Sequence, residues 1–212
     1  MSGCLPLTRQ PAENQRLAAS LAEHGIATCS LPLLALEPCP EGPRERQRML
    51  DLDLYQAVVV VSPVAARLGL ERLDHYWPQP PQGVAWLAVG GGTAQVLRDY
   101  GLPAECPAQG QDSEALLAMP LWPPLLARPD LKVLIWRGED GREHLADQLR
   151  AAGAQVDYLP LYARRMPAGL ETELAELAPQ IDRVLVLSVQ ALRHWREAAG
   201  GHWQAQRQWR CF

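Results

Sequence analysis

Residues 131–165 read LKVLIWRGEDGREHLADQLRAAGAQVDYLPLYARR, and this stretch decides the fold. Residues 132–136 form an apolar, β-branched run that is typical of a buried strand. A glycine-bounded turn follows, and apolar side chains then recur at helical spacing over residues 145–149. Gly153 stands where a glycine commonly ends a helix, and residues 156–161 have the pattern of a second strand. The stretch therefore predicts a strand–turn–helix–strand unit.

The same unit occurs a second time, over residues 5–36. The two copies keep a constant offset of 128 positions, the separation of Arg9 and Arg137, and they share a Leu-Ala pair, a glycine and a Leu-Pro-Leu segment. A following unit repeats at an offset of 126 positions, which aligns Ser62 in AVVVVSPVAARL with Ser188 in RVLVLSVQALRH. The repetition predicts a duplicated ancestral lobe, and the alternative is two ordinary units with similar patterns.

Composition excludes several classes of protein. The net charge is −4 and the sequence pI is about 5.7, which gives no overall attraction to nucleic acid. No apolar run approaches the ~20 residues of a membrane span, and the N-terminus lacks the pattern of a signal peptide. The five cysteines are scattered without a CxxC pair, which argues against a metal site or a disulfide framework. We expect a protein of the cytoplasm.

Strands and helices are predicted to alternate along the chain. The predicted strands are residues 5–8, 29–36, 57–61, 84–89, 132–136, 156–161 and 183–187. The predicted helices include residues 44–52, 65–73, 94–100, 170–177 and 189–199, and two proline-rich stretches, 75–82 and 120–129, are predicted to be loops. This order predicts an α/β fold with parallel sheets flanked by helices.

The repeat predicts two lobes. We place a crossing between them at the start of the proline-rich loop of residues 37–43, and a second crossing where the repeat ends, at Tyr162. In the first copy the serine unit is followed by VAWLAVGGGTAQVLRDYG, whereas near residue 210 the chain reads QWRCF. Either the second lobe closes with fewer strands or the chain is truncated, and we favour truncation.

Ligands of parallel sheets bind at the carboxyl ends of strands, where loops and helix N-termini meet. Several predicted turns have this position and can offer backbone N–H groups and a helix dipole to an anion. Nearby arginines match carboxylate and phosphate oxygens. The candidate binding residues are Arg9, Ser62, Gly91, Gly92, Thr93, Arg137, Gly138, Arg142 and Ser188.

Each candidate has a plainer interpretation. GGGTAQ could be a nucleotide-binding turn, but it lacks the third glycine of GxGxxG and the lysine of a P-loop. Ser62 and Ser188 are outside a GxSxG motif and are explained as helix N-caps. The dispersed histidines form no HExxH motif, and the arginines could be solvated surface charges.

Tyr162 differs from the other candidates. It ends the LPLY segment, where the chain crosses between lobes, and the first copy has Leu34 at the matching place. The repeat therefore does not require a tyrosine there. A phenol can donate a proton at neutral pH, although an amphipathic side chain at a domain seam is an equally good explanation.

The order of these segments resembles the uroporphyrinogen-III synthase family. The resemblance rests on LTRQPAENQRLAASLAEHG, PLLAL, AVVVVSPVAA, LAVGGGTAQVLRDYG, DSEALL, VLIWRGEDGREHLADQLRAAGAQVDYLPLYARR and VLVLSVQAL, and it spans residues 5–199. Members of that family have two α/β lobes joined by a two-stranded linker, with the active site in the cleft. The resemblance thus implies the same architecture here, with residues 1–35 and 166–212 forming one discontinuous lobe and residues 36–165 the other.

The resemblance also implies an activity. The family cyclises the linear tetrapyrrole hydroxymethylbilane to uroporphyrinogen III, inverting ring D with loss of water through a spiro intermediate, and it uses no cofactor. The family's tyrosine matches Tyr162, the candidate acid for the leaving hydroxyl. Backbone amides at turns matching Ser62, residues 90–93, Gly138 and Ser188 would hold the substrate carboxylates. We expect a monomer that uses no metal and binds neither nucleic acid nor membrane.

The chain departs from the family at its end. Members usually continue for some 40 residues, with a second glycine–threonine turn facing the cleft, so the activity of this chain is in question. Two rival functions are a non-catalytic two-lobed binder of a small anion and a nucleotide-using α/β enzyme.

Overall fold

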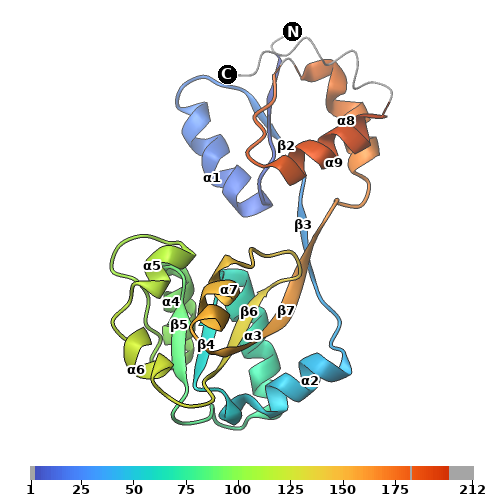
Figure 1. The fold of residues 1–212 in the computed structure, drawn as a ribbon. Helices are drawn as coiled ribbons and strands as arrows, with labels where there is room; N and C mark the ends of the chain where they lie inside the picture. Colours follow the sequence, from blue (N-terminus) through green and yellow to red (C-terminus); the bar gives the residue numbers. More distant parts are fainter. Residues whose placement is uncertain (1–2, 182, 201–212) are drawn as a thin grey trace. The chain divides into compact units, whose positions relative to one another are not determined.

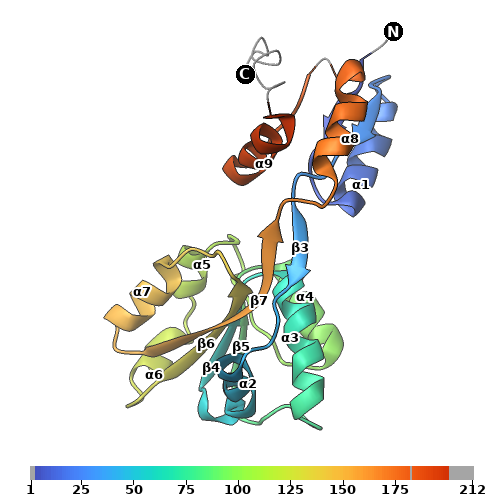
Figure 2. The same ribbon diagram turned by 90° about the vertical axis from the view of Figure 1, so that its right-hand side faces the viewer.

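The computed structural model describes residues 3–181 and 183–200 (Figures 1 and 2). The chain forms two compact units. Unit 1 contains the residues up to Leu36 and those from Arg164 on, and unit 2 is Glu37–Ala163. The chain enters unit 2 along β3 (Ala35–Pro38) and leaves it along β7 (Gln155–Arg165), and these two strands are neighbours in one sheet. The predicted α/β fold is confirmed.

Unit 2 is built on a five-stranded sheet in the order β3-β7-β6-β4-β5. One of its strands, β4 (Ala57–Val60), pairs in parallel with β5 (Ala85–Ala88) on one side and with β6 (Lys132–Gly138) on the other. The β7 strand pairs in parallel with β6. All four residues of β4 are fully buried, as expected for a parallel strand that is covered on both faces.

Helices cover both faces of this sheet (Figure 2). The helices on one face are α3 (Pro63–Tyr76), against which α2 (Pro43–Leu50) packs, and α4 (Gly91–Tyr100). The helices on the other face are α5 (Ser113–Leu117), α6 (Trp122–Leu126) and α7 (His144–Ala151), whose apolar side chains share a core with Val59 and Ile135. On the α3 face, Trp86 and Trp136 meet edge to face with their ring centroids 5.4 Å apart.

The connections of unit 2 reverse direction between β4 and β6. The chain leaves β4 into α3 on one face of the sheet, whereas it leaves the neighbouring β6 into α7 on the opposite face. Such a point leaves a crevice at the carboxyl ends of the strands. The fold of unit 2 therefore places a potential binding edge beside Ser62 and Gly138, which follow or end these two strands.

Unit 1 has a smaller sheet and its own core. Its strands β1 (Leu5–Leu7) and β2 (Thr28–Ser30) pair in parallel, and α1 (Pro11–Ala22) packs against both. The other helices are α8 (Leu170–Leu177) and α9 (Val189–Ala199). The buried core residues are Leu31, Leu33, Leu170, Leu174, Ala191, Trp195 and Ala199.

Two predicted strands were wrong. Residues 29–36 contain the end of β2, a break at residues 31–34 and the start of β3, and the two strands belong to different sheets. The chain breaks there because the buried Leu31 and Leu33 turn into the core of unit 1 around Pro32, which has no N–H for a ladder. Residues 183–187 make only an isolated parallel bridge, between Leu7 and Leu185. The carbonyl of Leu185 instead accepts a hydrogen bond from the Thr8 hydroxyl at 2.8 Å, and such a side-chain bond competes with a ladder.

Two further boundaries differ from the prediction. The proline-rich stretch at residues 120–129 contains the short helix α6, in which Trp122 is buried and Pro123 occupies the first turn, where a proline is tolerated. Helix α4 begins at Gly91, so the glycine run predicted to be a turn is itself the first turn of the helix. The QWRCF segment lies outside the described residues.

Two of the scattered cysteines meet in unit 1. The sulfur of Cys4 lies 2.6 Å from that of Cys29, and both residues are free thiols. No described helix combines the length and the apolar character needed to cross a membrane.

Candidate functional site

The carboxyl ends of the parallel strands of unit 2 gather most of the predicted site residues. Ser62 follows β4, Gly91 and Thr93 follow β5, and the turn at residues 139–143 follows β6. Tyr162 lies near the end of β7, opposite Gly138 in the register of the two strands. Because these strands are parallel, their carboxyl ends lie along one edge of the sheet.

The hydroxyl groups of Ser62 and Tyr162 meet at this edge. Their oxygen atoms are 3.2 Å apart, a hydrogen bond in which either group can be the donor. The Ser62 oxygen also accepts the backbone N–H of Ala65 at 3.1 Å, which confirms the predicted N-cap of α3. Since this cap occupies the serine as an acceptor, its proton can point to the phenol oxygen.

Gly138 makes room for the Tyr162 ring. A Cβ atom on Gly138 would lie 2.9 Å from the ring, closer than real side chains approach. The ladder between β6 and β7 also shifts its register between Arg137 and Gly138, and the N–H of Glu139 donates to the carbonyl of Tyr162 at 2.7 Å. Tyr162 is 4% exposed, so its ring is fixed by packing while its hydroxyl reaches Ser62.

The structure places Arg137 inside unit 2 instead of on its surface. The residue is 6% exposed, and its guanidinium donates to the carboxylate of Glu143 at 2.9 Å and lies 4.4 Å from the centre of the Tyr158 ring. The Tyr158 hydroxyl also donates to Glu143. The hydrogen bond from Tyr158, together with Arg137, lowers the pKa of Glu143 below its ordinary value, so the carboxylate is ionised at neutral pH.

The glycine run after β5 opens α4. A Cβ atom on Gly91 or Gly92 would have nothing within 4 Å, so space is open above this turn. The first N–H groups of a helix lack partners within the helix and carry the positive end of its dipole. This turn can therefore accept a carboxylate, with Thr93 buried beneath it. Arg142 is exposed in the turn after β6, which β4 separates from β5 in the sheet.

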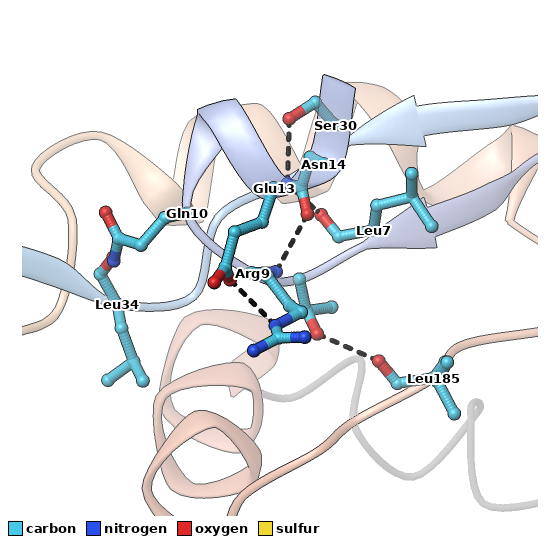
Figure 3. A network of polar contacts seen from close by, with 9 residues as sticks. Leu7, Arg9, Gln10, Glu13, Asn14, Ser30, Leu34 and Leu185 are labelled. Carbon is cyan, nitrogen blue, oxygen red and sulfur yellow. Dashed lines mark hydrogen bonds and ion pairs between the residues drawn. The ribbon is translucent and has the colours of Figure 1, made fainter. Parts of the chain in front are cut away.

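Unit 1 carries the other two candidates, Arg9 and Ser188. Arg9 follows β1, its side chain is 53% exposed, and its Nε lies 2.8 Å from a carboxylate oxygen of Glu13 (Figure 3). Ser188 caps α9 by accepting the N–H of Ala191 at 3.1 Å, the same contact that Ser62 makes. The segment before Ser188 bridges β1 in parallel, so both candidates end parallel segments at one edge of unit 1.

Sequence reasoning missed Asn14, which organises the turn between β1 and α1. Asn14 is 1% exposed, and its side chain donates to the carbonyl of Leu7 at 2.6 Å and to the hydroxyl of Ser30 at 2.9 Å (Figure 3). The side-chain amide oxygen of Asn14 accepts the backbone N–H of Arg9 at 3.0 Å. The available signal was an amide in the first turn of a helix after Pro11. Glu143 and Tyr158 were also missed, and their sequence positions carry no motif.

The described residues contain no group of three or more His, Cys, Asp or Glu side chains that could hold a metal ion. The chemistry that unit 2 offers at its binding edge is a phenol hydrogen-bonded to a serine, beside helix N-termini suited to carboxylates.

Comparison with known proteins identifies the family. The family model of uroporphyrinogen-III synthase HemD matches residues 15–212. The uroporphyrinogen-III synthase of Salmonella typhimurium is 30% identical over 162 residues, which are 74% of this chain and 63% of that protein. The match thus spans less than two thirds of the Salmonella protein. That of Escherichia coli K12 is 28% identical over 193 residues, which are 88% of this chain and 76% of that protein.

Solved structures share the fold. A uroporphyrinogen III synthase mutant from Thermus thermophilus superposes with a TM-score of 0.62 at 18% identity, covering 93% of this chain and 82% of the other. The enzyme from Helicobacter pylori 26695 gives a TM-score of 0.53 at 12% identity, covering 93% of this chain and 78% of the other. With residues 15–212 matched by its model, the chain belongs to the uroporphyrinogen-III synthase HemD family.

Proposed function

We propose that the protein cyclises hydroxymethylbilane to uroporphyrinogen III, with inversion of ring D and loss of water through a spiro intermediate. The proposal is supported by membership of the HemD family and by the names of the Salmonella and E. coli relatives. The observation that carries it is the contact of 3.2 Å between the Ser62 and Tyr162 hydroxyls at the reversal point of the sheet of unit 2.

The reaction begins when the substrate hydroxyl leaves as water, which needs a proton. In this proposal the Tyr162 phenol supplies that proton, and the Ser62 hydroxyl donates a hydrogen bond to the phenolate that remains. Ring D attacks the resulting azafulvenium cation with the α-carbon that links it to ring C, which gives the spiro intermediate. That link then breaks, the other α-carbon of ring D bonds to the methylene carbon left on ring C, and the hydrogen lost from this α-carbon returns as a proton to the Tyr162 phenolate. Holding ring D in the required geometry can supply much of the barrier reduction.

The substrate carboxylates need binding sites of positive potential that leave the Tyr162 phenol free to donate its proton. The proposed sites in unit 2 are the N–H of Val64 after Ser62, those of Gly91 and Gly92 in the turn that Thr93 follows, and the Gly138 turn with the exposed Arg142. In unit 1 they are Arg9 and the amides after Ser188. Arg9 would exchange its exposed ion pair with Glu13 for a substrate carboxylate, since such pairs contribute little free energy.

The decisive experiment is product analysis. The protein is incubated with freshly prepared hydroxymethylbilane, the products are oxidised to porphyrins, and isomers I and III are separated by chromatography. Isomer III above the blank without protein supports the proposal, and formation of isomer I alone overturns it. Stabilisation by the substrate without isomer III would instead indicate a non-catalytic binder of polycarboxylates.

We further propose that the protein works as a monomer in the cytoplasm. Analytical ultracentrifugation with and without substrate tests the oligomeric state, and cell fractionation tests the location.

A further inference from the structure

Arg137, Glu143 and Tyr158 interlock around the turn between β6 and α7. The Glu143 carboxylate accepts from the Arg137 guanidinium at 2.9 Å through one oxygen and from the Tyr158 hydroxyl through the other. Tyr158 stacks on the guanidinium, whose Nε also donates to the carbonyl of Gly138 at 3.2 Å. Arg137 lies at the end of β6 and Glu143 immediately precedes α7, so their contact closes the turn of residues 138–142 into a side-chain loop. We call these three side chains the clasp.

The turn fits closely over the clasp. A Cβ atom on Gly141 would lie 2.5 Å from the guanidinium nitrogens of Arg137, so the backbone of the turn passes directly over the buried cation. A buried charge that loses its partner is strongly unfavourable. Without the Glu143 carboxylate, the Arg137 guanidinium would have to move toward solvent to be hydrated. The turn that passes over it would then have to shift.

The same turn holds Tyr162 on its other side. The N–H of Glu139 donates to the Tyr162 carbonyl at 2.7 Å, and the Tyr162 ring rests where a side chain on Gly138 would be. A shift of the turn is thus transmitted to both the backbone and the ring of Tyr162. The hydroxyl of that ring is the group that meets Ser62.

We propose that Glu143 is a positioning residue, which holds the Tyr162 hydroxyl in place through Arg137 and the β6–α7 turn. In this proposal Arg137 supports the turn as the buried cation of the clasp, and it does not itself contact a substrate carboxylate. The inference rests on the proposed function for its kinetic part, because the positioned hydroxyl is the proposed acid.

A double-mutant cycle in the whole chain tests the kinetic part. Glu143→Ala should lower kcat about tenfold with a smaller change in KM, since small misplacements of a reacting group cost one to two orders of magnitude. Glu143→Gln, which can still accept a hydrogen bond from Arg137, should recover most of the loss. In a Tyr162→Phe background Glu143→Ala should change kcat less than about twofold, because coupled residues are not additive.

Asp147→Asn is the matched control. Asp147 also lies on α7 and also faces an arginine, Arg150 at 3.6 Å, but both side chains are exposed. This variant should retain wild-type kinetics. An effect of Glu143→Ala that is equally large with and without the Tyr162 hydroxyl would overturn the proposal.

A second measurement does not depend on activity. The amide of Glu139 should exchange with solvent at least about tenfold faster in Glu143→Ala than in wild type or Asp147→Asn, since its hydrogen bond to Tyr162 is loosened. An unchanged exchange rate of the Glu139 amide in Glu143→Ala would overturn the positioning role of Glu143, even if the protein makes isomer III. If wild type makes only isomer I, the proposed function fails, and the exchange result still decides whether Glu143 holds the turn. Should Glu143→Ala not fold, Tyr158→Phe takes its place in both measurements.

Discussion

The hydroxyl oxygen of Ser62 lies 3.2 Å from that of Tyr162, although 100 positions separate the two residues in the sequence. The cap of α3 fixes the Ser62 hydroxyl, and the packing of the Tyr162 ring on Gly138 fixes the phenol. Together these two structural requirements place the two hydroxyl groups within hydrogen-bond distance. The geometry leads to predictions that separate the structural from the chemical role of each residue.

Replacing either capping serine should weaken the start of a helix, but the two changes should have unequal effects on turnover. Ser62→Ala and Ser188→Ala each remove a cap bond of 3.1 Å, which should lower the free energy of unfolding by about 1 kcal/mol. Only Ser62→Ala also removes the hydrogen-bond partner of Tyr162, so it should lower kcat several-fold more than Ser188→Ala does. Urea denaturation and the isomer III assay measure the two effects. Equal kcat values would contradict a role for Ser62 beyond its cap.

Tyr162→Phe should lower turnover by an order of magnitude or more, because general acids typically contribute ~10²–10⁴-fold. The change leaves the ring in its place on Gly138, so the urea midpoint should stay close to that of wild type. Steady-state kinetics with hydroxymethylbilane provide the test. Normal turnover in this variant would leave the phenol with a packing role alone.

The sequence was sufficient to predict those parts of the site that follow from local chemistry. The apolar run before Ser62, the proline after it and the cap itself are all local signals, and the structure has all three. The strand predicted at residues 183–187 failed although its pattern matches that of β4. Its backbone oxygen at Leu185 is taken by Thr8, a partner 177 positions away that no local pattern reveals.

Contacts between residues far apart in the sequence explain why the side chains of Arg9 and Arg137 differ in exposure. Arg9 and Arg137 occupy matching places in the repeat, and the sequence treats them alike. In the structure Arg9 is half exposed and Arg137 is buried, because only Arg137 meets both an acid that precedes α7 and a ring supplied by β7. The difference depends on Glu143 and Tyr158, residue types that are common on surfaces, so it could be found only once the chain was folded.

Gly69→Ala should destabilise unit 2, although alanine favours helices by up to ~1 kcal/mol over glycine. A Cβ atom on Gly69 would lie 2.1 Å from the buried ring of Trp136, and overpacking of a core typically costs about 1–3 kcal/mol. The steric cost should therefore exceed the gain in propensity. Gly91→Ala is the control, because a Cβ atom there would meet nothing within 4 Å. Urea denaturation should rank Gly69→Ala well below wild type and Gly91→Ala close to it.

The contribution of Glu143 to stability should depend on pH. Its folded pKa lies below the ordinary value of 4.5, because Tyr158 and Arg137 stabilise the carboxylate. The unfolded state therefore binds the proton more readily, so the stabilisation is fully present above pH 4.5 and is lost as the pH falls through the lower folded pKa. The stability difference between wild type and Glu143→Gln should thus be constant near neutral pH and shrink in acid. A difference that persists unchanged to about pH 3 would contradict this assignment of charge.

Cys29 should resist alkylation. Burial raises its pKa from 9.0 to about 12, and the neighbouring Cys4 sulfur contributes to the shift. Because the thiolate is the nucleophile, Cys29 should react with iodoacetamide at pH 8 roughly a thousandfold more slowly than an unhindered thiol of ordinary pKa. Burial is the largest cause, so Cys4→Ser should accelerate the reaction only in part, while denaturation in urea should restore it fully. Time-resolved mass spectrometry of the peptides measures each rate. Labelling of Cys29 in the folded protein as fast as in urea would show that its thiol is neither desolvated nor held by Cys4.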